Sequence, residues 1–152
     1  MSEQQQIFNI EKIYLKDLSL EIPNAPQVFT EREAPRIDIN LHNEAKMIEA
    51  GLYEVVLTAT VTAKHNEKTA FLVEAAQAGI FRIRNFGQEE LAAVVNVACP
   101  TALLPYARET VSNTLTRAGF PPVVLPHVLF ESLFQQRLQE QSQAQAGAAP
   151  VA

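Results

Sequence analysis

The side chains best suited to nucleophilic, acid–base or metal chemistry are few and scattered in this chain. Three histidines, His42, His65 and His127, lie far apart in the sequence, and the single cysteine, Cys99, precedes a proline in an apolar segment. Nothing near Cys99 would lower the pKa of its thiol, as a nucleophile requires. The chain has no GxSxG, P-loop, GxGxxG or HExxH motif. This pattern predicts a non-catalytic protein with no cofactor and no metal site.

Three acidic residues are better candidates for binding than for catalysis. Asp17 and Glu21 share one face of an expected strand and lie about 13 Å apart at a rise of about 3.3 Å per residue. Paired catalytic carboxylates lie closer together. With Glu74 they form a candidate acidic stripe that would dock a basic partner. Ordinary solvated acids are the alternative interpretation.

Composition predicts one domain whose surface is partly covered by other molecules. The chain has 152 residues, of which 47% are hydrophobic and 19% charged, and its net charge is −5. A domain of this size can bury a core without disulfides, and the charged fraction is somewhat low. The acidic balance and the lack of Lys/Arg clusters argue against nucleic acid as a partner.

Three features predict a cytosolic protein. One cysteine permits no intrachain disulfide, which favours a reducing compartment. The polar N-terminus lacks the apolar core of a signal peptide. The most apolar stretch, Leu91–Pro105, contains two prolines and falls short of the roughly 20 residues of a membrane span.

The first half of the chain has the period-2 pattern of strands. We expect strands over Phe8–Ile22, Arg36–His42, Leu52–Lys64 and Thr69–Ile83. The short polar turn before Thr69 predicts an antiparallel hairpin, whereas the Pro-rich connection Pro23–Pro35 is too long for one. In the first strand the even positions share one largely apolar side: Phe8, Ile10, Tyr14, Leu18, Leu20 and Ile22.

The second half has helical spacing. We expect helices over Glu89–Ala98, over Leu104–Ala118 after an interruption at Pro100, and over Leu129–Gln141. From Gln139 the composition turns to Gln, Ala, Ser and Gly, which predicts a disordered tail over 139–152 behind a single domain over 1–138. Strands followed by helices indicate an α+β fold, with helices packed on one face of an antiparallel sheet.

Two apolar features lack an obvious cover. Both faces of the strand Thr69–Ile83 are mainly small or apolar, so one can pack on helices while the other meets another subunit; an exposed Ala-rich patch is the alternative. The Pro-rich loop with Phe29, laid beside a helix with Phe130 and Phe134, would form a groove for extended peptides. Packing of these aromatics in an ordinary core is the alternative.

Several longer motifs occur in a characteristic order and resemble those of SecB, the family of bacterial protein-export chaperones. The resemblance covers about Phe8 to Leu138. Its motifs are Ile13-Tyr14-x-Lys16-Asp17-Leu18-Ser19-x-Glu21, Pro23-Asn24-Ala25-Pro26-x-Val28-Phe29, Tyr53-Glu54-Val55-Val56-Leu57, Thr69-Ala70-Phe71-Leu72-Val73-Glu74, Gly79-Ile80-Phe81, Cys99-Pro100 and Leu104-Pro105-Tyr106-Ala107-Arg108-Glu109.

This resemblance implies a four-stranded antiparallel sheet with two helices on one face and a long crossover loop after the first strand. It also implies a cytoplasmic homotetramer, a dimer of dimers, that holds unfolded precursor proteins without ATP and delivers them to the SecA translocation motor. The positions that match the family's motor-docking residues are Asp17, Glu21, Leu72 and Glu74. Those that match its tetramer-assembly residues are Val73, Ala75 and Gln77. Those that match its client groove are Pro26, Val28, Phe29, Phe130, Leu133 and Phe134.

The chain departs from the family pattern in three places. The crossover loop has Glu31-Arg32-Glu33 and no tryptophan, Val73 stands where relatives often have cysteine, and the tail is almost uncharged. Two other functions are kept as alternatives. One is a holdase of the same fold that serves a non-export client such as an antitoxin, and the other is a small-molecule-binding or catalytic α+β oligomer, which would need a deep closed pocket.

Overall fold

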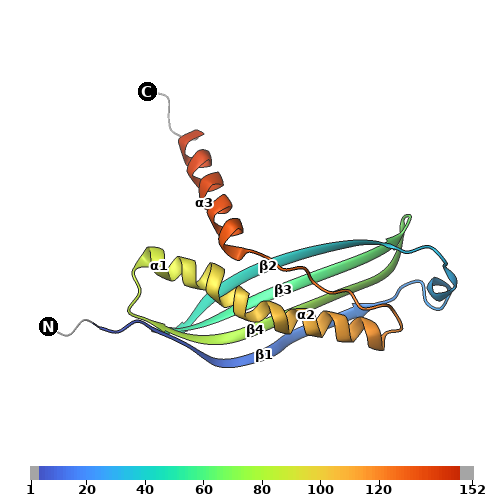
Figure 1. Ribbon diagram of the computed structural model, residues 1–152, viewed down its shortest axis with the longest axis horizontal. Helices are drawn as coiled ribbons and strands as arrows, with labels where there is room; N and C mark the ends of the chain where they lie inside the picture. The colour runs from blue at the N-terminus through green and yellow to red at the C-terminus, as the bar shows by residue number, and fades with distance from the viewer. Residues whose placement is uncertain (1–3, 148–152) are drawn as a thin grey trace.

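Four strands form a single antiparallel sheet in the order β1-β4-β3-β2 (Figure 1). The computed structural model describes residues 4–147. The loop over residues 22–35 carries the chain from β1 at one edge of the sheet to β2 at the other, and contains a short 3-10 helix, η1. The strands and η1 are β1 (Ile7–Glu21), η1 (Gln27–Thr30), β2 (Arg36–Glu49), β3 (Leu52–His65) and β4 (Lys68–Arg84).

Strand β2 is longer than expected. The sequence predicted a strand that ends at His42, but β2 continues to Glu49 and pairs with β3 along its whole length. The alternation fades after His42 because Asn43–Glu49 mixes polar and apolar residues on both faces. The hairpin closes at Gly51, whose φ of +76° lies in the left-handed region that glycine adopts without strain.

Two β-bulges in β1 change which residues share a face. The register with β4 shifts between Ile10 and Lys12 and again between Leu15 and Asp17. A bulge adds one residue to one strand and so reverses the alternation beyond it. The prediction that Tyr14 lies on the same side as Phe8 and Ile10 is therefore wrong. Tyr14 pairs with Ala78, on the opposite face of the sheet.

One continuous helix crosses the sheet, where two were expected. It consists of α1 (Gln88–Ala93), a π-helical segment η2 (Val94–Ala98) and α2 (Cys99–Arg117). Pro100 has no N–H to donate to the Val95 carbonyl five residues earlier, as a π turn requires. The Asn43 side chain of β2 donates to that carbonyl instead, at 3.1 Å. The wider turn and this hydrogen bond allow the helix to pass through the proline.

The core lies between α2 and the two central strands. Leu103, Val111 and Leu115 of α2 are fully buried against β3 and β4. A single helix covers only two strands, so the flanking strands keep large apolar side chains exposed on this helix side. These are Phe8, Ile10, Leu15 and Leu18 of β1, and Ile37, Ile39 and Met47 of β2.

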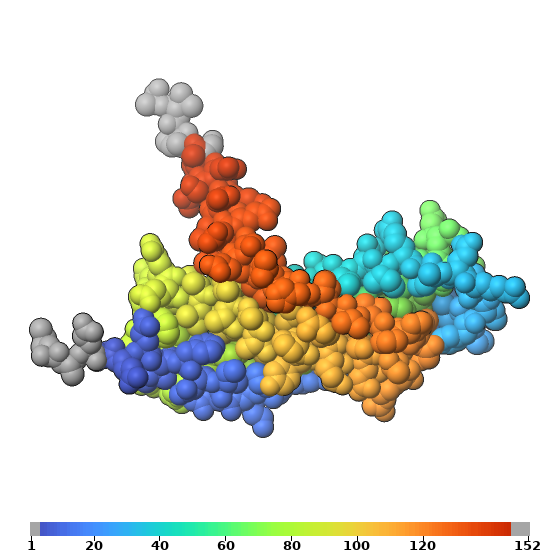
Figure 2. All heavy atoms as spheres, in the orientation of Figure 1, coloured from blue at the N-terminus to red at the C-terminus, as the bar shows by residue number. Residues whose placement is uncertain are grey.

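The last helix, α3 (Phe130–Gly147), stands clear of the sheet (Figures 1 and 2). Phe130 is buried in the core, but the helix beyond Phe134 is exposed. The α+β class with a four-stranded sheet and two helices is confirmed, although α3 contacts the rest of the molecule only through its first turns. The helix also continues to Gly147, where a disordered tail was expected from Gln139; residues 148–152 lie outside the described part of the chain.

Candidate docking face and client groove

The face of the sheet opposite α2, here termed the outer face, gathers the expected motor-docking residues. Asp17 pairs with Ala76, Ser19 with Glu74, and Glu21 with Leu72, on neighbouring strands β1 and β4. Asp17 and Glu21 both follow the second bulge and keep one alternation, so they lie on the same face as the even positions of β4. The acids are exposed and Leu72 is half-buried. The structure thus brings Asp17, Glu21, Leu72 and Glu74 into one patch, the acidic stripe.

A ladder of threonines borders the acidic stripe on β3. Thr58 and Thr62 pair with Ala76 and Leu72, and Thr60, opposite Glu74, donates a hydrogen bond to its Oε2 at 3.0 Å. Within residues 4–147 no ion pair involves Asp17, Glu21 or Glu74. The stripe is therefore an anionic surface with hydroxyl neighbours and no internal counter-ion, as a docking site for a cationic partner requires.

The other half of the outer face holds a nearly buried carboxylate, Glu54, which is 8% exposed. Lys16 Nζ lies 2.8 Å from Glu54 Oε1, Lys46 Nζ lies 3.7 Å from the same atom, and the Tyr14 hydroxyl donates to Oε2. The Lys16 and Tyr14 hydrogen bonds hold the pKa of Glu54 below its usual range against the effect of burial. Burial and the bond to Glu54 raise the pKa of Tyr14 to about 12.

The expected assembly residues Val73, Ala75 and Gln77 lie on the helix side of β4, buried under α2. They do not form an exposed surface on this chain, so any effect on assembly passes through α2 or β1. Gln77 contacts both elements: its Nε2 donates to the Tyr14 carbonyl at the second bulge (3.1 Å), and its Oε1 accepts from Thr110 of α2 (3.3 Å).

The crossover loop forms an apolar groove with the segment that follows α2. The Phe29 and Phe120 rings lie 5.1 Å apart and the Phe120 and Phe71 rings 4.8 Å apart. Val28 is buried beneath the groove, Pro26 precedes η1, and the groove has a volume of about 480 Å³. The sequence placed the last helix beside this loop, whereas the structure places Gly119–Val123 there.

The other expected groove residues, on α3, lie elsewhere on the helix side. Phe130, Leu133 and Phe134 surround a small cavity of about 40 Å³ with Leu41 of β2 and Leu57 of β3. The six residues therefore form two clusters rather than one. The exposed Ile37 and Ile39 of β2 lie along the strand between the two clusters. From Ile37 to Asn43 the strand spans about 20 Å at roughly 3.3 Å per residue.

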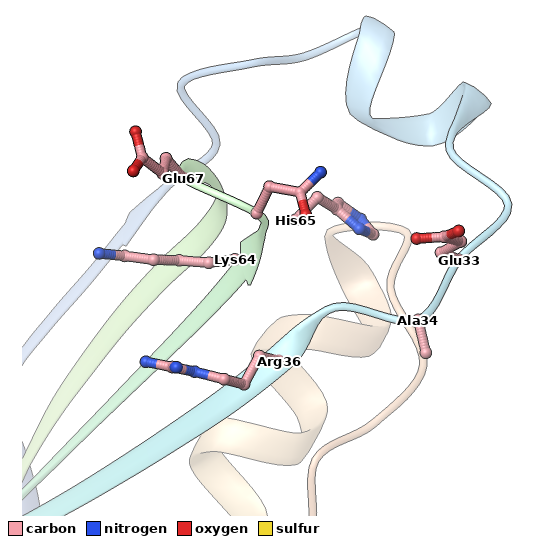
Figure 3. Close-up of a pocket in the computed structure, with 7 residues that line it drawn as sticks. Glu33, Ala34, Arg36, Lys64, His65 and Glu67 are labelled. Atoms are coloured by element: carbon pink, nitrogen blue, oxygen red, sulfur yellow. The ribbon is translucent and has the colours of Figure 1, made fainter.

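A polar cleft next to the groove mixes charges that do not converge. It lies between the crossover loop and the β3–β4 turn and is lined by residues that include Glu33, Arg36, Lys64, His65 and Glu67. In Figure 3 Arg36 and Lys64 extend in the same direction, whereas Glu33 lies on the opposite side near His65. This open arrangement is unlike the closed pocket with converging polar groups that a small-molecule site or active site needs.

The histidines and the cysteine lie in settings that do not favour nucleophilic or acid–base chemistry. Cys99 is buried, and burial raises the pKa of its thiol to about 12, so the thiolate is suppressed. His42 is exposed and 3.6 Å from Glu44, His65 is the last residue of β3, and His127 lies in the segment between α2 and α3. Over the described residues, 4–147, no group of His, Cys, Asp and Glu is placed to hold a metal ion.

Comparison with known proteins decides the family. The model of the family described as "Preprotein translocase subunit SecB" matches residues 1–141. The chain belongs to the SecB family. It is 58% identical over 142 residues to protein-export protein SecB of Methylobacillus flagellatus, covering 93% of this chain and 90% of that one. Protein-export protein SecB of Chromobacterium violaceum is 57% identical over 147 residues, covering 95% and 98%.

The SecB fold is also supported by a solved structure. The chain resembles a Mycobacterium tuberculosis SecB-like chaperone, Rv1957, in complex with a peptide from the HigA1 antitoxin, with a TM-score of 0.67 and 20% identity. The match covers 80% of this chain and 90% of that one. The interpretation of the sequence as a protein-export chaperone of the SecB family is confirmed by the family match and its relatives.

The long helix of this SecB-family chain is more apolar than the sequence argument allowed. By length and composition alone, Gln88–Arg117 could cross a membrane. The helix is longer than the apolar stretch Leu91–Pro105 because η2 joins its two halves. A helix that packs on a sheet passes the same test, and α2 packs on β3 and β4.

Sequence reasoning missed two contributors to these surfaces. Phe120, which joins Phe29 to Phe71, follows the expected helix Leu104–Ala118 and was not singled out. Glu54 was not singled out, although it is the only acid between Leu52 and Lys64. An isolated acid in a strand of Val and Thr was the available signal, because a carboxylate in such a setting needs a partner when the strand is central.

Proposed function

We propose that this SecB-family chain holds unfolded precursor proteins without nucleotide in the cytoplasm and delivers them to the SecA translocation motor, with no catalytic step. The observation that carries this proposal is the arrangement of its two binding surfaces. The apolar groove lies on the helix side of the sheet and the acidic stripe on the outer face. A client and a motor can therefore be bound at the same time, as delivery requires.

The client surface is suited to extended chains of varied sequence. The groove around Phe29 and Phe120 and the exposed Ile37 and Ile39 offer apolar contacts without a fixed hydrogen-bond pattern. Burial of apolar surface is non-directional, so such a surface discriminates little between sequences. We propose that a client runs from the Phe29 cluster along β2 toward Phe130, Leu133 and Phe134.

Self-association is the second part of the proposal. The helix Gln88–Arg117 contains an apolar stretch long enough to cross a membrane, yet α2 packs only one side of itself on the sheet. Tyr106 is 50% exposed on α2, and Ile10, Leu15 and Leu18 are exposed on the helix side of the edge strand β1. Other copies of the chain would cover this area, and the family resemblance implies a homotetramer, a dimer of dimers.

The test is a refolding assay with a slow-folding export precursor and no nucleotide. We expect the protein to delay folding of the precursor and the addition of SecA to release it. The stoichiometry of arrest, measured together with native mass spectrometry, reports whether the working unit is a tetramer. A protein that leaves the refolding rate unchanged at saturating concentration would contradict the holdase function.

A second candidate is a chaperone of the same fold that serves a non-export client such as an antitoxin. The peptide complex of the M. tuberculosis SecB-like chaperone, a structure with this fold, motivates it. The acidic stripe separates the two candidates, because an antitoxin chaperone has no need of it. Direct binding to purified SecA supports the export function, and its absence supports the alternative.

A further inference from the structure

We propose that Glu54 is a positioning residue for partner docking: it holds Lys16 and so keeps the neighbouring Asp17 free to bind a cationic partner. The proposal rests on the docking function proposed above. Glu54 lies outside the acidic stripe and acts on the stripe residue Asp17 through the Lys16 side chain.

The second bulge of β1 explains why Lys16 needs a partner other than Asp17. Leu15 pairs with Gln77 and Asp17 pairs with Ala76, so Lys16 is the extra residue between them. A bulge places two successive residues opposite one residue of the partner strand. Lys16 reaches Glu54 on the outer face, and Asp17 lies on the same face. An ammonium and a carboxylate on adjacent residues of one face are natural partners for each other.

Glu54 offers Lys16 a better partner than Asp17 does. The Glu54 side chain is 9% exposed, and its Oε1 lies 2.8 Å from Lys16 Nζ. Its other oxygen accepts the Tyr14 hydroxyl, so the carboxylate is held in a fixed orientation. Asp17 is exposed, and ion pairs at exposed sites are weak because solvent competes for both charges. The lowered pKa of Glu54 agrees with a strong preference for the bond to Lys16.

The remaining ion pairs of the sheet follow the same pattern. Arg82 pairs with Glu11 at 2.7 Å and Arg36 with Asp38 at 3.2 Å, while Lys46 lies 3.7 Å from Glu54. In the part of the chain that the structure describes, every paired base is matched with an acid outside the stripe. Glu54 is distinctive because the base that it holds is the one adjacent to a stripe residue.

Glu11 provides a matched control. Glu54→Gln and Glu11→Gln each remove one negative charge from a paired acid of the sheet. Glu11→Gln releases Arg82, whereas Glu54→Gln releases Lys16 and the more distant Lys46. The base released by Glu11→Gln is Arg82, six residues along β4 from Ala76, the partner of Asp17. That separation is about 20 Å at roughly 3.3 Å per residue, beyond the reach of an arginine side chain.

The experiment measures the Kd for purified SecA at low ionic strength, with client holding as a second readout. We expect Glu54→Gln to weaken SecA binding about threefold, the size of one exposed ion pair, and Glu11→Gln to leave it unchanged. Lys16→Met in the Glu54→Gln background should restore the wild-type Kd, which loss of local structure would not do. High salt should remove the difference, and client holding should be the same in all variants.

Lys16→Met alone tests the proposal without changing Glu54. Because Lys16 is already held by Glu54, its removal should change the Kd by less than about twofold. A several-fold tightening would show that Lys16 neutralises Asp17 in the native protein and would overturn the proposal, as would a double variant that binds no better than Glu54→Gln. If Asp17→Lys/Glu74→Lys abolishes binding and Glu54→Gln does not weaken it, only the role of Glu54 fails. If Asp17→Lys/Glu74→Lys binds SecA normally, the docking assignment fails as well.

Discussion

In the function proposed here, the two faces of this sheet use the same strands for opposite kinds of recognition. On the helix side, α2 covers β3 and β4 and leaves apolar side chains exposed on both flanking strands. On the outer face, polar residues form ordered rows, with an acidic stripe over β1 and β4 and paired charges around Glu54. Apolar burial tolerates varied clients, whereas charge complementarity selects one partner. A single sheet thereby separates a permissive surface from a selective one.

The largest effect that tests this comparison is charge reversal on the acidic stripe. Asp17→Lys/Glu74→Lys should lower SecA affinity by at least about 100-fold, because like charges at a contact repel and displace the docked partner. The Kd from isothermal titration calorimetry measures it. Client holding in the refolding assay should not change, since the stripe lies on the opposite face from the groove.

The Asp17→Lys/Glu74→Lys variant can also contradict the separation of the two faces. A parallel loss of client holding would mean that clients also use the outer face, or that the reversed charges disturb assembly. Native mass spectrometry distinguishes these two outcomes. The single variant Asp38→Lys, on β2 of the outer face and separated from Leu72 by Thr62 of β3, is the control for charge alone.

Gln77 is buried on the helix side and contacts the β1 bulge that precedes Asp17, so it should couple α2 to the acidic stripe. It is 4% exposed, and it joins the Tyr14 carbonyl at the second bulge to Thr110 of α2. Gln77→Ala leaves two partly buried groups without partners and opens a cavity, so we expect the free energy of unfolding to fall by about 1–3 kcal/mol. Urea denaturation measures the loss. Gln77 variants should also shift the oligomeric state if this residue assists assembly by fixing α2 against β1.

Truncation of an exposed aromatic should have a smaller effect, confined to the permissive surface. Phe29→Ala removes a ring that is 49% exposed and tilted by 35° against the Phe120 ring. We expect client affinity to fall about fivefold, the loss of part of one apolar side chain, with SecA binding unchanged. Phe8→Ala is the matched control, because Phe8 is exposed on the helix side of β1, outside the groove. Equal effects of the two changes would contradict the assignment of the groove.

Periodicity and turn residues were enough to predict the four strands, the hairpin before Thr69 and the α+β class. They failed where one residue changes the pattern. The bulges of β1 are invisible to period-2 counting and reversed the side of Tyr14. Pro100 indicated a break, but the Val95 carbonyl that it leaves without a donor accepts a hydrogen bond from Asn43, which lies 57 residues before Pro100 in the chain. Tertiary contacts decide such cases.

The sequence also predicted one part of the candidate site better than the other. The sequence pattern indicated Asp17, Glu21 and Glu74, and the resemblance added Leu72. The register of β1 and β4 places all four on neighbouring strands, and their role in docking stays a prediction. The groove was predicted only in part, since it depends on how the loops meet. Phe29 contacts Phe120, not the last helix, and nothing local in residues 118–123 indicates that contact.

The smallest expected effect lies in the pH dependence of the Tyr14–Glu54 pair. Burial and the bond to Glu54 raise the pKa of Tyr14 from 10.0 to about 12, so the folded state retains this proton more strongly than the unfolded state does. The stability from Tyr14 is then fully present below the pKa of the unfolded chain, near pH 10, and is lost as pH rises toward 12. The difference in unfolding free energy between the wild type and Tyr14→Phe should therefore shrink over this interval, and the difference in absorbance at 295 nm should titrate near pH 12. Because Lys16 still holds Glu54 in this variant, SecA binding at neutral pH should not change; a change would mean that Tyr14, and not only the lysine, maintains the charge pattern of the outer face.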